Sequence, residues 1–346
     1  TATTNQYTST GAGTVSLGDD SVFLYSNGQA SLTNGRNISS NSDRVIGFYI
    51  KGNATNRGDL TNNATIDFSN SKGSIGIYAP GGKATNKGRI LVGNTDSIDP
   101  ATGLVYSDVS KITYGIGMAA DNGGHIINDN EIRVYGDKSI GMYGKGAGTK
   151  VENNGTIFLD GSRATDTNKI QSMVGVYVDE GATFVNNGDI RTADAYAGKI
   201  VNGVQKVNNN VVGLVGVAVL NGSTLENYVK IDIDAYSSYG VLIKGTAANK
   251  SIIKNDGEIN ISGLRSYGVR YDADSQGVSG NLPIGTDATP ANVLPALNGG
   301  VGTITSTNGA NDYYAPKDPS KTLAGVGIIQ LPNGRLAIQR NGVVLN

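Results

Sequence analysis

The chain has 346 residues, fifty of them glycine, with a formal net charge of −1, one histidine and no cysteine. A nearly neutral chain gives no electrostatic reason to expect nucleic acid or an anionic membrane as a partner. The lack of cysteine excludes disulfides, thiolate metal sites and cysteine nucleophiles. No apolar run reaches the roughly 18 residues of a membrane-spanning helix, and Thr1 does not begin a signal peptide. The chain is therefore either soluble in the cell or an internal piece of an exported protein.

Residues 1–30 are predicted to form one or more irregular first coils, because 20–25 read D-S-V-F-L-Y without the glycine of the later strands. A regular unit follows from residue 31. Its clearest copy is S-I-G-M-Y-G-K-G-A-G-T-K-V-E-N-N-G-T-I-F-L at 139–159. Alternation of apolar residues with a period of two predicts three short strands in this unit.

Three linked columns recur along the chain eight times. An isoleucine closes each unit, at Ile38, Ile66, Ile90, Ile132, Ile157, Ile190, Ile231 and Ile259. Four residues before it stands an asparagine, at Asn34, Asn62, Asn86, Asn128, Asn153, Asn186, Asn227 and Asn255. Two residues before the asparagine the side chain is apolar. Asparagine tolerates the left-handed backbone of a corner, and its amide can bond to the asparagine of the next unit, so we expect these residues to stack.

A glycine with apolar flanks marks another strand of each unit. We assign it to Gly47, Gly76, Gly115, Gly141, Gly175, Gly216, Gly240 and Gly268. The flanking residues are expected to face the interior together. Two residues after several of these glycines stands an outward-facing tyrosine, at Tyr49, Tyr78, Tyr143 and Tyr177. Such a stripe could stack on sugars, but we favour stacking of the rings on one another.

Each unit needs a neighbour above and below to pair its backbone. We therefore predict an all-β fold, a right-handed parallel β-helix of three-strand coils of about 24 residues, with protruding loops on one edge. The regular β-helix is predicted over 31–271. Residues 272–346 are predicted to hold an irregular coil around Ile304, a long loop and a terminal hairpin turning at Asn333-Gly334. Neither end looks like a polar cap, so the natural chain is expected to continue in at least one direction.

Three inserts break the regular spacing. They follow Ile90, Ile157 and Ile190, at 92–112, 160–172 and 192–211, and all enter at the same corner of the coil. They should therefore leave one edge of the rod. Loops held on a rigid scaffold are where repeat proteins usually place recognition, although long surface loops also persist because they cost little stability. In the third insert, Asn202-Gly203 between alternating apolar residues predicts a hairpin.

The sequence gives little support to catalysis, metal binding or a cofactor. Outward charges of opposite sign fall on successive coils, for example Asp189 and Lys230, and should pair across the ladder, which leaves few carboxylates for an enzyme. His125 is expected to be a surface residue. Calcium ligands among Asp96, Asp99 and Asp108 match no known loop spacing, and the G-x-G at 115–117 lacks the lysine and helix of a phosphate loop.

The alternation of N-K-G-R-I at 86–90 with S-I-G-I-Y at 74–78 resembles the passenger repeats of the large fusobacterial autotransporter adhesins. The resemblance spans about residues 30–271. It implies display on the bacterial cell surface, anchorage in the outer membrane by a β-barrel absent from this chain, roles in biofilm and coaggregation, and attachment to host or bacterial surface receptors that are glycans or proteins. It carries over no binding residues, because the matching pattern is the scaffold.

We therefore expect an adhesin segment with no enzymatic activity, no metal and no cofactor, which binds its receptor through the insert edge. The candidate contacts are Tyr106, Lys111, Arg163, Tyr196, Lys199 and Lys206. A glycan-binding module that uses the tyrosine stripe, and a purely structural spacer, stay open as alternatives. A polysaccharide lyase or hydrolase would need a cluster of unpaired carboxylates on an outer face.

Overall fold

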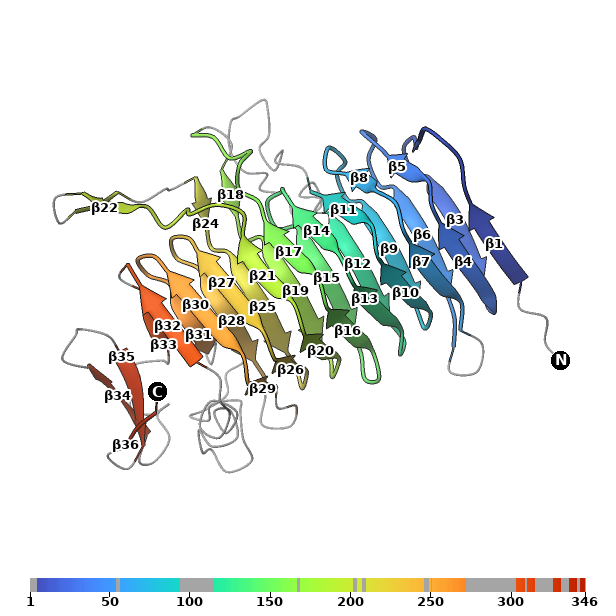
Figure 1. The fold of residues 1–346 in the computed structure, drawn as a ribbon. Coiled ribbons are helices and arrows are strands. Elements are labelled where there is room, and N and C mark those ends of the chain that lie inside the picture. Colours follow the sequence, from blue (N-terminus) through green and yellow to red (C-terminus); the bar gives the residue numbers. More distant parts are fainter. Residues whose placement is uncertain are drawn as a thin grey trace.

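In the computed structural model, the described residues are 5–53, 57–93, 115–166, 169–201, 204–206, 210–245, 249, 251–271, 303–308, 310–314, 326–330, 336–340 and 343–345. Over these ranges the chain contains strands and no helix. Three long parallel sheets, which we name A, B and C, run the length of a rod (Figure 1). The chain passes through sheets C, A and B in turn and then returns to C one step further along. The fold is a right-handed parallel β-helix, the handedness that parallel crossovers adopt.

Sheet A carries the asparagine column. Over the described residues its strands, in spatial order, are β1 Asn5–Ser9, β4 Ala30–Asn34, β7 Asp59–Asn62, β10 Lys83–Asn86, β13 His125–Asn128, β16 Lys150–Asn153, β20 Thr183–Asn186, β26 Thr224–Asn227 and β29 Ile252–Asn255. Each strand from β4 onward ends on its column asparagine, whose side chain lies in the interior. Each asparagine amide from Asn34 to Asn227 donates to the carboxamide oxygen of the asparagine in the next coil, at distances of 2.6–3.0 Å. The predicted asparagine stack is confirmed.

Sheet B carries the closing isoleucines. In the same described ranges its strands are β2 Thr14–Ser16, β5 Asn37–Ser39, β8 Ile66–Phe68, β11 Arg89–Val92, β14 Glu131–Val134, β17 Thr156–Leu159, β21 Asp189–Thr192, β27 Lys230–Asp234, β30 Glu258–Ser262 and β32 Thr303–Thr307. The isoleucines pair in register from Ile38 to Ile259. All eight are fully buried in one continuous core that runs along the rod.

Sheet C carries the glycine column. Its described strands are β3 Val22–Asn27, β6 Ile46–Lys51, β9 Ile75–Pro80, β12 Ile116–Asp121, β15 Ile140–Lys145, β19 Val174–Asp179, β25 Val215–Leu220, β28 Tyr239–Lys244, β31 Tyr267–Tyr271 and β33 Asn311–Tyr314. The register pairs Ile116 with Ile75 and with Ile140, so the glycine of this coil is Gly117. Our assignment to Gly115 is wrong, because both glycines of G-I-G have apolar neighbours and only strand pairing distinguishes them.

A second correction concerns the residue before each glycine. Val176 and Val217, which follow the glycine, lie in the core, whereas Val174 and Val215, which precede it, pack in a separate cluster with Tyr177. The two flanks therefore face opposite sides, because the chain bends at the glycine. Sheet C consequently carries two columns on its outer face, the residues before the glycines and the tyrosines after them, and these side chains pack partly against one another.

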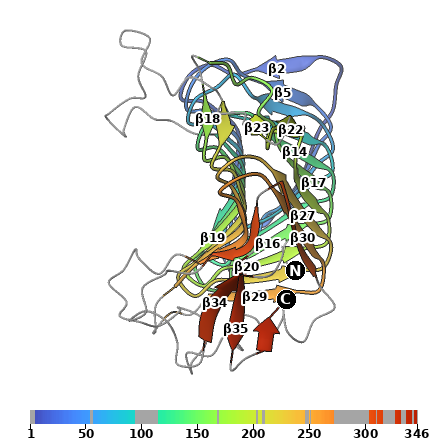
Figure 2. The same ribbon diagram turned by 90° about the vertical axis from the view of Figure 1, so that its left-hand side faces the viewer.

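Three smaller sheets complete the described fold, one of which, the pair β22 Lys199–Val201 and β23 Val204–Lys206, is described with the inserts below. The short parallel pair β18 Ile170–Gln171 and β24 Val211–Val212 lies at the corner between sheets B and C, and the rod seen end-on is bent inward near β18 and β19 (Figure 2). Near the C-terminus, β34 Val326–Gln330, β35 Leu336–Arg340 and β36 Val343–Leu345 form an antiparallel sheet. The long loop expected in 272–302 lies outside the described residues.

Candidate receptor-binding edge

The second and third inserts share one corner and are joined to each other. Strand β18 of the second insert pairs in parallel with β24 of the third, and Val212 bridges onward to Tyr236. Ile170 and Val211 are fully buried and belong to the main core. The bases of both inserts therefore widen the coil with apolar side chains, and only their outer parts are loops. This arrangement gives the edge a rigid foundation.

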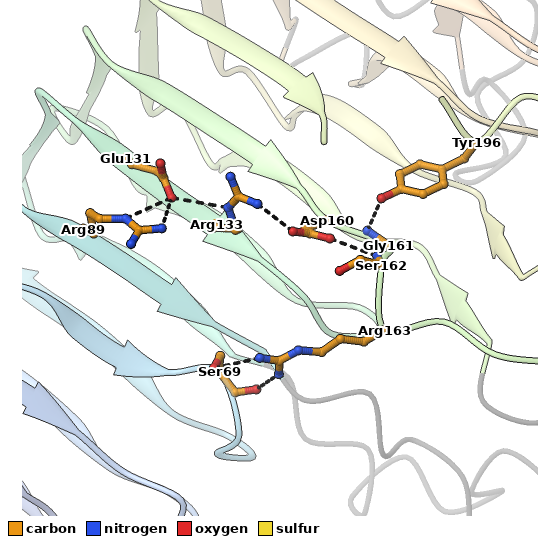
Figure 3. A network of polar contacts seen from close by, with 9 residues as sticks. All are labelled: Ser69, Arg89, Glu131, Arg133, Asp160, Gly161, Ser162, Arg163 and Tyr196. Carbon is orange, nitrogen blue, oxygen red and sulfur yellow. Dashed lines mark hydrogen bonds and ion pairs between the residues drawn. The ribbon is translucent and has the colours of Figure 1, made fainter. Parts of the chain in front are cut away.

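A series of ion pairs between charged side chains fixes the start of the second insert (Figure 3). The Asp160 side chain is 4% exposed, and its Oδ2 lies 2.8 Å from Nη1 of Arg133. Its other oxygen accepts the backbone N–H of Ser162 at 2.9 Å, which fixes the turn that opens the insert. Arg133 also contacts Glu131, which pairs with Arg89 on the preceding coil. Asp160 is thus a buried acceptor that is paired on both oxygens.

Tyr196 supports the inserts from inside. Its side chain is 5% exposed, and its hydroxyl accepts the backbone N–H of Gly161 at 2.9 Å. Burial, followed by the charge of Asp160, raises the pKa of the Tyr196 hydroxyl, which therefore stays protonated. Its backbone N–H bonds to the carbonyl of Asp234 on the next coil. The expectation that Tyr196 is an exposed contact is corrected: the ring ties the third insert to the second.

Arg163 is likewise engaged within the protein. Its guanidinium donates to the carbonyl of Ser69 at 2.6 Å and to the Ser69 hydroxyl at 3.1 Å (Figure 3). The same group lies 4.1 Å from the ring centre of Tyr135. Arg163 is half-buried. It therefore fastens the second insert to a coil far earlier in the chain, and only part of its surface is open to a partner.

The predicted hairpin of the third insert is confirmed. Strands β22 Lys199–Val201 and β23 Val204–Lys206 pair antiparallel, with Val201 opposite Val204 across Asn202-Gly203. In this register Lys199 stands opposite Lys206. The ribbon leaves the corner and extends past the later coils (Figure 1). It is the part of the edge that projects furthest among the described strands.

Both ends of the hairpin are anchored. The backbone N–H of Ala197, just before the hairpin, bonds to the Asp234 carboxylate at 3.2 Å. Asn210, just after it, donates to Asp166 of the second insert at 2.8 Å. The hairpin therefore rises from fixed points. Of the other candidate contacts, Tyr106 and Lys111 of the first insert lie outside the described residues, as do Asp96, Asp99 and Asp108.

The tyrosine stripe on the outer face of sheet C is largely satisfied by its own stacking. Tyr143 and Tyr177 stack with ring centres 5.6 Å apart and planes 25° apart. Tyr49 contacts Tyr25 and Tyr78, each at 5.1 Å. Rings that cover one another offer edges and hydroxyls to solvent and keep few faces for a sugar. The prediction that these rings stack on one another is confirmed for Tyr143 and Tyr177, whereas Tyr49 meets Tyr78 edge-on, with planes 82° apart.

Opposite charges pair across neighbouring coils at Arg89–Glu131 and Glu226–Lys254, as expected, but the example of Asp189 and Lys230 has the expected register and a different pairing. Asp189 stands opposite Lys230, and Arg191 opposite Asp232. The ion pair, however, runs along the strand, from Lys230 Nζ to Asp232 Oδ2 at 2.8 Å. Arg191 instead lies 4.7 Å from the ring centre of Phe158. Residues two apart share one face of a strand, so a lysine reaches its own strand as readily as the next coil.

His125 lies on the outer face of sheet A, and its side chain is 18% exposed, less than the surface position we expected. Its Nε2 is 3.4 Å from Glu152, and Lys83 and Lys150 are its register neighbours. Burial lowers the pKa of His125, and the two lysines lower it further, which together outweigh the raising effect of Glu152. The folded protein therefore resists protonation here more than the unfolded chain does.

We expect this histidine to make stability fall under mildly acidic conditions. Because the folded pKa lies below the ordinary value of 6.5, the unfolded chain binds more protons between the two values. Stability is then complete above pH 6.5 and declines as the pH falls toward the folded pKa. Thermal unfolding from pH 7.5 to 5 should show a steeper decline for the native chain than for His125→Gln. Equal slopes would assign the decline to other groups.

Comparison with known families finds a match over residues 54–189. The matched family is the BigA third pectate lyase-like domain. The match covers less than half of the 346 residues and agrees with the β-helical fold. Similarity to a BigA-type domain favours a surface-exposed bacterial protein, and the fusobacterial family stays a prediction from the repeats. Comparisons with curated proteins and with solved structures give no match.

The described residues contain no helix that is long and apolar enough to cross a membrane. They also contain no group of three or more His, Cys, Asp or Glu residues that could hold a metal ion. The residues that sequence reasoning missed are Asp160 and Arg133, which fasten the insert edge. The run Asp160-Gly161-Ser162, an aspartate before a turn, is the signal that could have indicated them.

Proposed function

We propose that this chain is a segment of a surface-displayed bacterial adhesin, and that the insert edge between sheets B and C contacts a receptor on host cells or on other bacteria. The observation that carries the proposal is the anchored hairpin β22–β23, which rises from fixed points on a rigid rod. Similarity to a BigA-type domain supports the surface location. The mechanism is rigid display without covalent chemistry, so most of the ordering entropy is lost on folding and little is lost on binding.

The revised contact set is Lys199 and Lys206 of the hairpin, with Tyr106 and Lys111 of the first insert. Lys199 and Lys206 stand directly opposite each other, an arrangement of like charges that disfavours the hairpin by itself. Such an arrangement is reasonable where the positive pair serves a partner with negative groups. Tyr196 and Arg163 act as supports of this edge.

The proposal includes no enzymatic activity. Its support is that four carboxylates of the described residues are ion-paired, namely Glu131 with Arg89, Asp160 with Arg133, Glu180 with Lys145 and Glu226 with Lys254. The carboxylates of Asp189, Asp256 and Glu258, which line one corner, have no such pair among the described residues, so the assay below is directed at them as well. Pairing with a cation favours the ionised form and opposes use as a general acid. An assay for reducing-end release from polysaccharides would contradict the proposal if it detected turnover.

Replacing residues 199–206 with a short Gly-Ser link tests the site. We expect attachment to receptor-bearing cells to fall about tenfold, equivalent to about 1.4 kcal/mol, with little change in thermal stability because the ribbon projects from the rod and pairs only with itself (Figure 1). Unchanged attachment would favour a structural spacer or another site. Tyr143→Ala is the matched control, since it alters the tyrosine stripe and leaves the edge intact.

A charge variant separates the lysines from the shape of the ribbon. Lys199→Glu places opposite charges across the hairpin, which stabilises the ribbon by a few tenths of a kcal/mol up to about 1 kcal/mol while it removes the positive pair. If the lysines contact an anionic group, this variant should attach as weakly as the hairpin deletion. Attachment at the native level would remove the lysines from the contact set.

A further inference from the structure

A shallow depression of about 450 Å³ lies at the corner between sheets A and B, away from the insert edge. Its volume falls within the range of about 300–1,000 Å³ that is usual for ligand sites. Four successive coils line it. One wall is the register row Asp189, Lys230, Glu258 and Thr303 of sheet B. Neighbouring strands of a sheet lie about 4.8 Å apart, so the sheet holds these four polar groups at a fixed and regular spacing.

The other wall is where the repeat departs from its pattern. The two residues after the column asparagine are polar, small or glycine in seven of the eight coils, and only in this coil are they Tyr228 and Val229. Glycine is favoured at the second position because an added Cβ would lie 2.1 Å from the carbonyl of the preceding coil, as at Gly188 and Gly257. The departure therefore occurs at a position where the scaffold prefers no side chain.

Both of these side chains are open to solvent. Tyr228 is 47% exposed and Val229 is 39% exposed. An aromatic and an aliphatic side chain exposed together beside a depression are characteristic of a ligand site rather than of a packed corner. Neither residue belongs to the core clusters of the described residues, and the Tyr228 hydroxyl donates to Glu226 at 3.3 Å, which orients the ring.

The charges of the depression define its ligand. Asp189, Asp256 and Glu258 bring three carboxylates, and none of them forms an ion pair with another described residue. The one cation, Lys230, is paired with Asp232. The net negative charge disfavours acidic ligands. The carboxylates instead accept strong hydrogen bonds from uncharged hydroxyl donors, and the tyrosine ring can pack on a C–H face.

We propose that this corner binds a neutral sugar of an oligosaccharide, with the pyranose face packed on Tyr228 and its hydroxyls donating to Asp256 and Glu258. The site lies on a different corner from the inserts, so it is independent of the receptor contact proposed above. A rod that carries both would hold a glycan on one corner and a second receptor on the other.

The test uses the full 346-residue chain and immobilised probes of known charge. The neutral probes are lactose, N-acetyllactosamine, cellotriose and maltotriose, and the acidic probes are sialyllactose and trigalacturonate. We expect at least one neutral probe to bind and both acidic probes to bind more weakly. Tyr228→Ala should weaken binding about tenfold, whereas Tyr228→Phe, which keeps the ring, should stay within about threefold.

Tyr7→Ala is the matched control, because Tyr7 is also an exposed tyrosine and lies at the other end of the rod. It should bind as the native chain does. Thermal unfolding of each variant verifies that the fold is retained. No binding of any neutral probe, preference for the acidic probes, or an equal effect of Tyr7→Ala and Tyr228→Ala would each overturn the proposal. Loss of cell attachment in the hairpin variants would leave this glycan result unaffected.

Discussion

Gly175→Ala should lower the stability of the rod by at least about 3 kcal/mol, because the new methyl group has no space between coils. A Cβ at this position would lie 2.5 Å from the carbonyl oxygen of Gly216 and 2.7 Å from Cγ2 of Ile190. The oxygen belongs to the next coil, and it cannot move away without breaking strand pairing in sheet C. The same contact recurs down the column, for example between Gly141 and Gly175.

Gly18→Ala is the control for this substitution, because nothing lies within 4 Å of a Cβ at Gly18. We expect it to change stability by no more than about 0.5 kcal/mol. Circular dichroism melts should show a fall of about 5 °C or more for Gly175→Ala and almost none for Gly18→Ala. In a stacked-coil protein the damage should be local, so amide exchange should rise first in β19 and β25. Equal melting of both variants would show that the coils tolerate the methyl group.

The fold could be predicted from the sequence because each coil repeats the same contacts. Ile157 and Asn153 each have a counterpart in the preceding coil and in the following coil. The repeat is therefore still recognised from the other coils when one coil is misread. The prediction failed where a local sequence fits two registers. G-I-G at 115–117 offers two glycines with apolar neighbours, and only pairing with Ile75 and Ile140 selects Gly117.

The sequence could predict the position of the insert edge but not the side-chain contacts within it. Spacing alone showed that the inserts share a corner, and Asn202-Gly203 indicated the hairpin that β22 and β23 form. The burial of Tyr196 and the reach of Arg163 to Ser69 depend on how two inserts from different coils meet. The contacts between the inserts have no periodic signal in the sequence, because neither insert is repeated. Aromatic and charged side chains of a loop, which the sequence suggests as receptor contacts, can therefore bind within the protein and hold the loop in place, as Tyr196 and Arg163 do.

Asn153→Ala should destabilise the rod by about 2–4 kcal/mol, because it opens the buried asparagine ladder in the middle. The Asn153 amide donates to Asn186 Oδ1 at 3.0 Å, and its own oxygen accepts from Asn128 at 2.9 Å. Alanine leaves the Asn186 oxygen without its donor in a site that water does not reach. The neighbour Asn154 is exposed, so Asn154→Ala is the control and should cost no more than about 0.5 kcal/mol.

Asn153→Asp distinguishes the hydrogen bond from the shape of the side chain. The ionised aspartate is almost the same size but cannot donate to Asn186, and it places a charge in a buried ladder, so its pKa should rise. When the folded pKa is raised, the folded state takes up protons more readily than the unfolded one, and the destabilisation shrinks as the pH falls. The difference in melting temperature from the native chain should therefore be largest at pH 7 and smaller at pH 4, where the protonated acid can donate again. A difference that does not change with pH would mean that packing at the corner, and not the donated hydrogen bond, holds successive coils together.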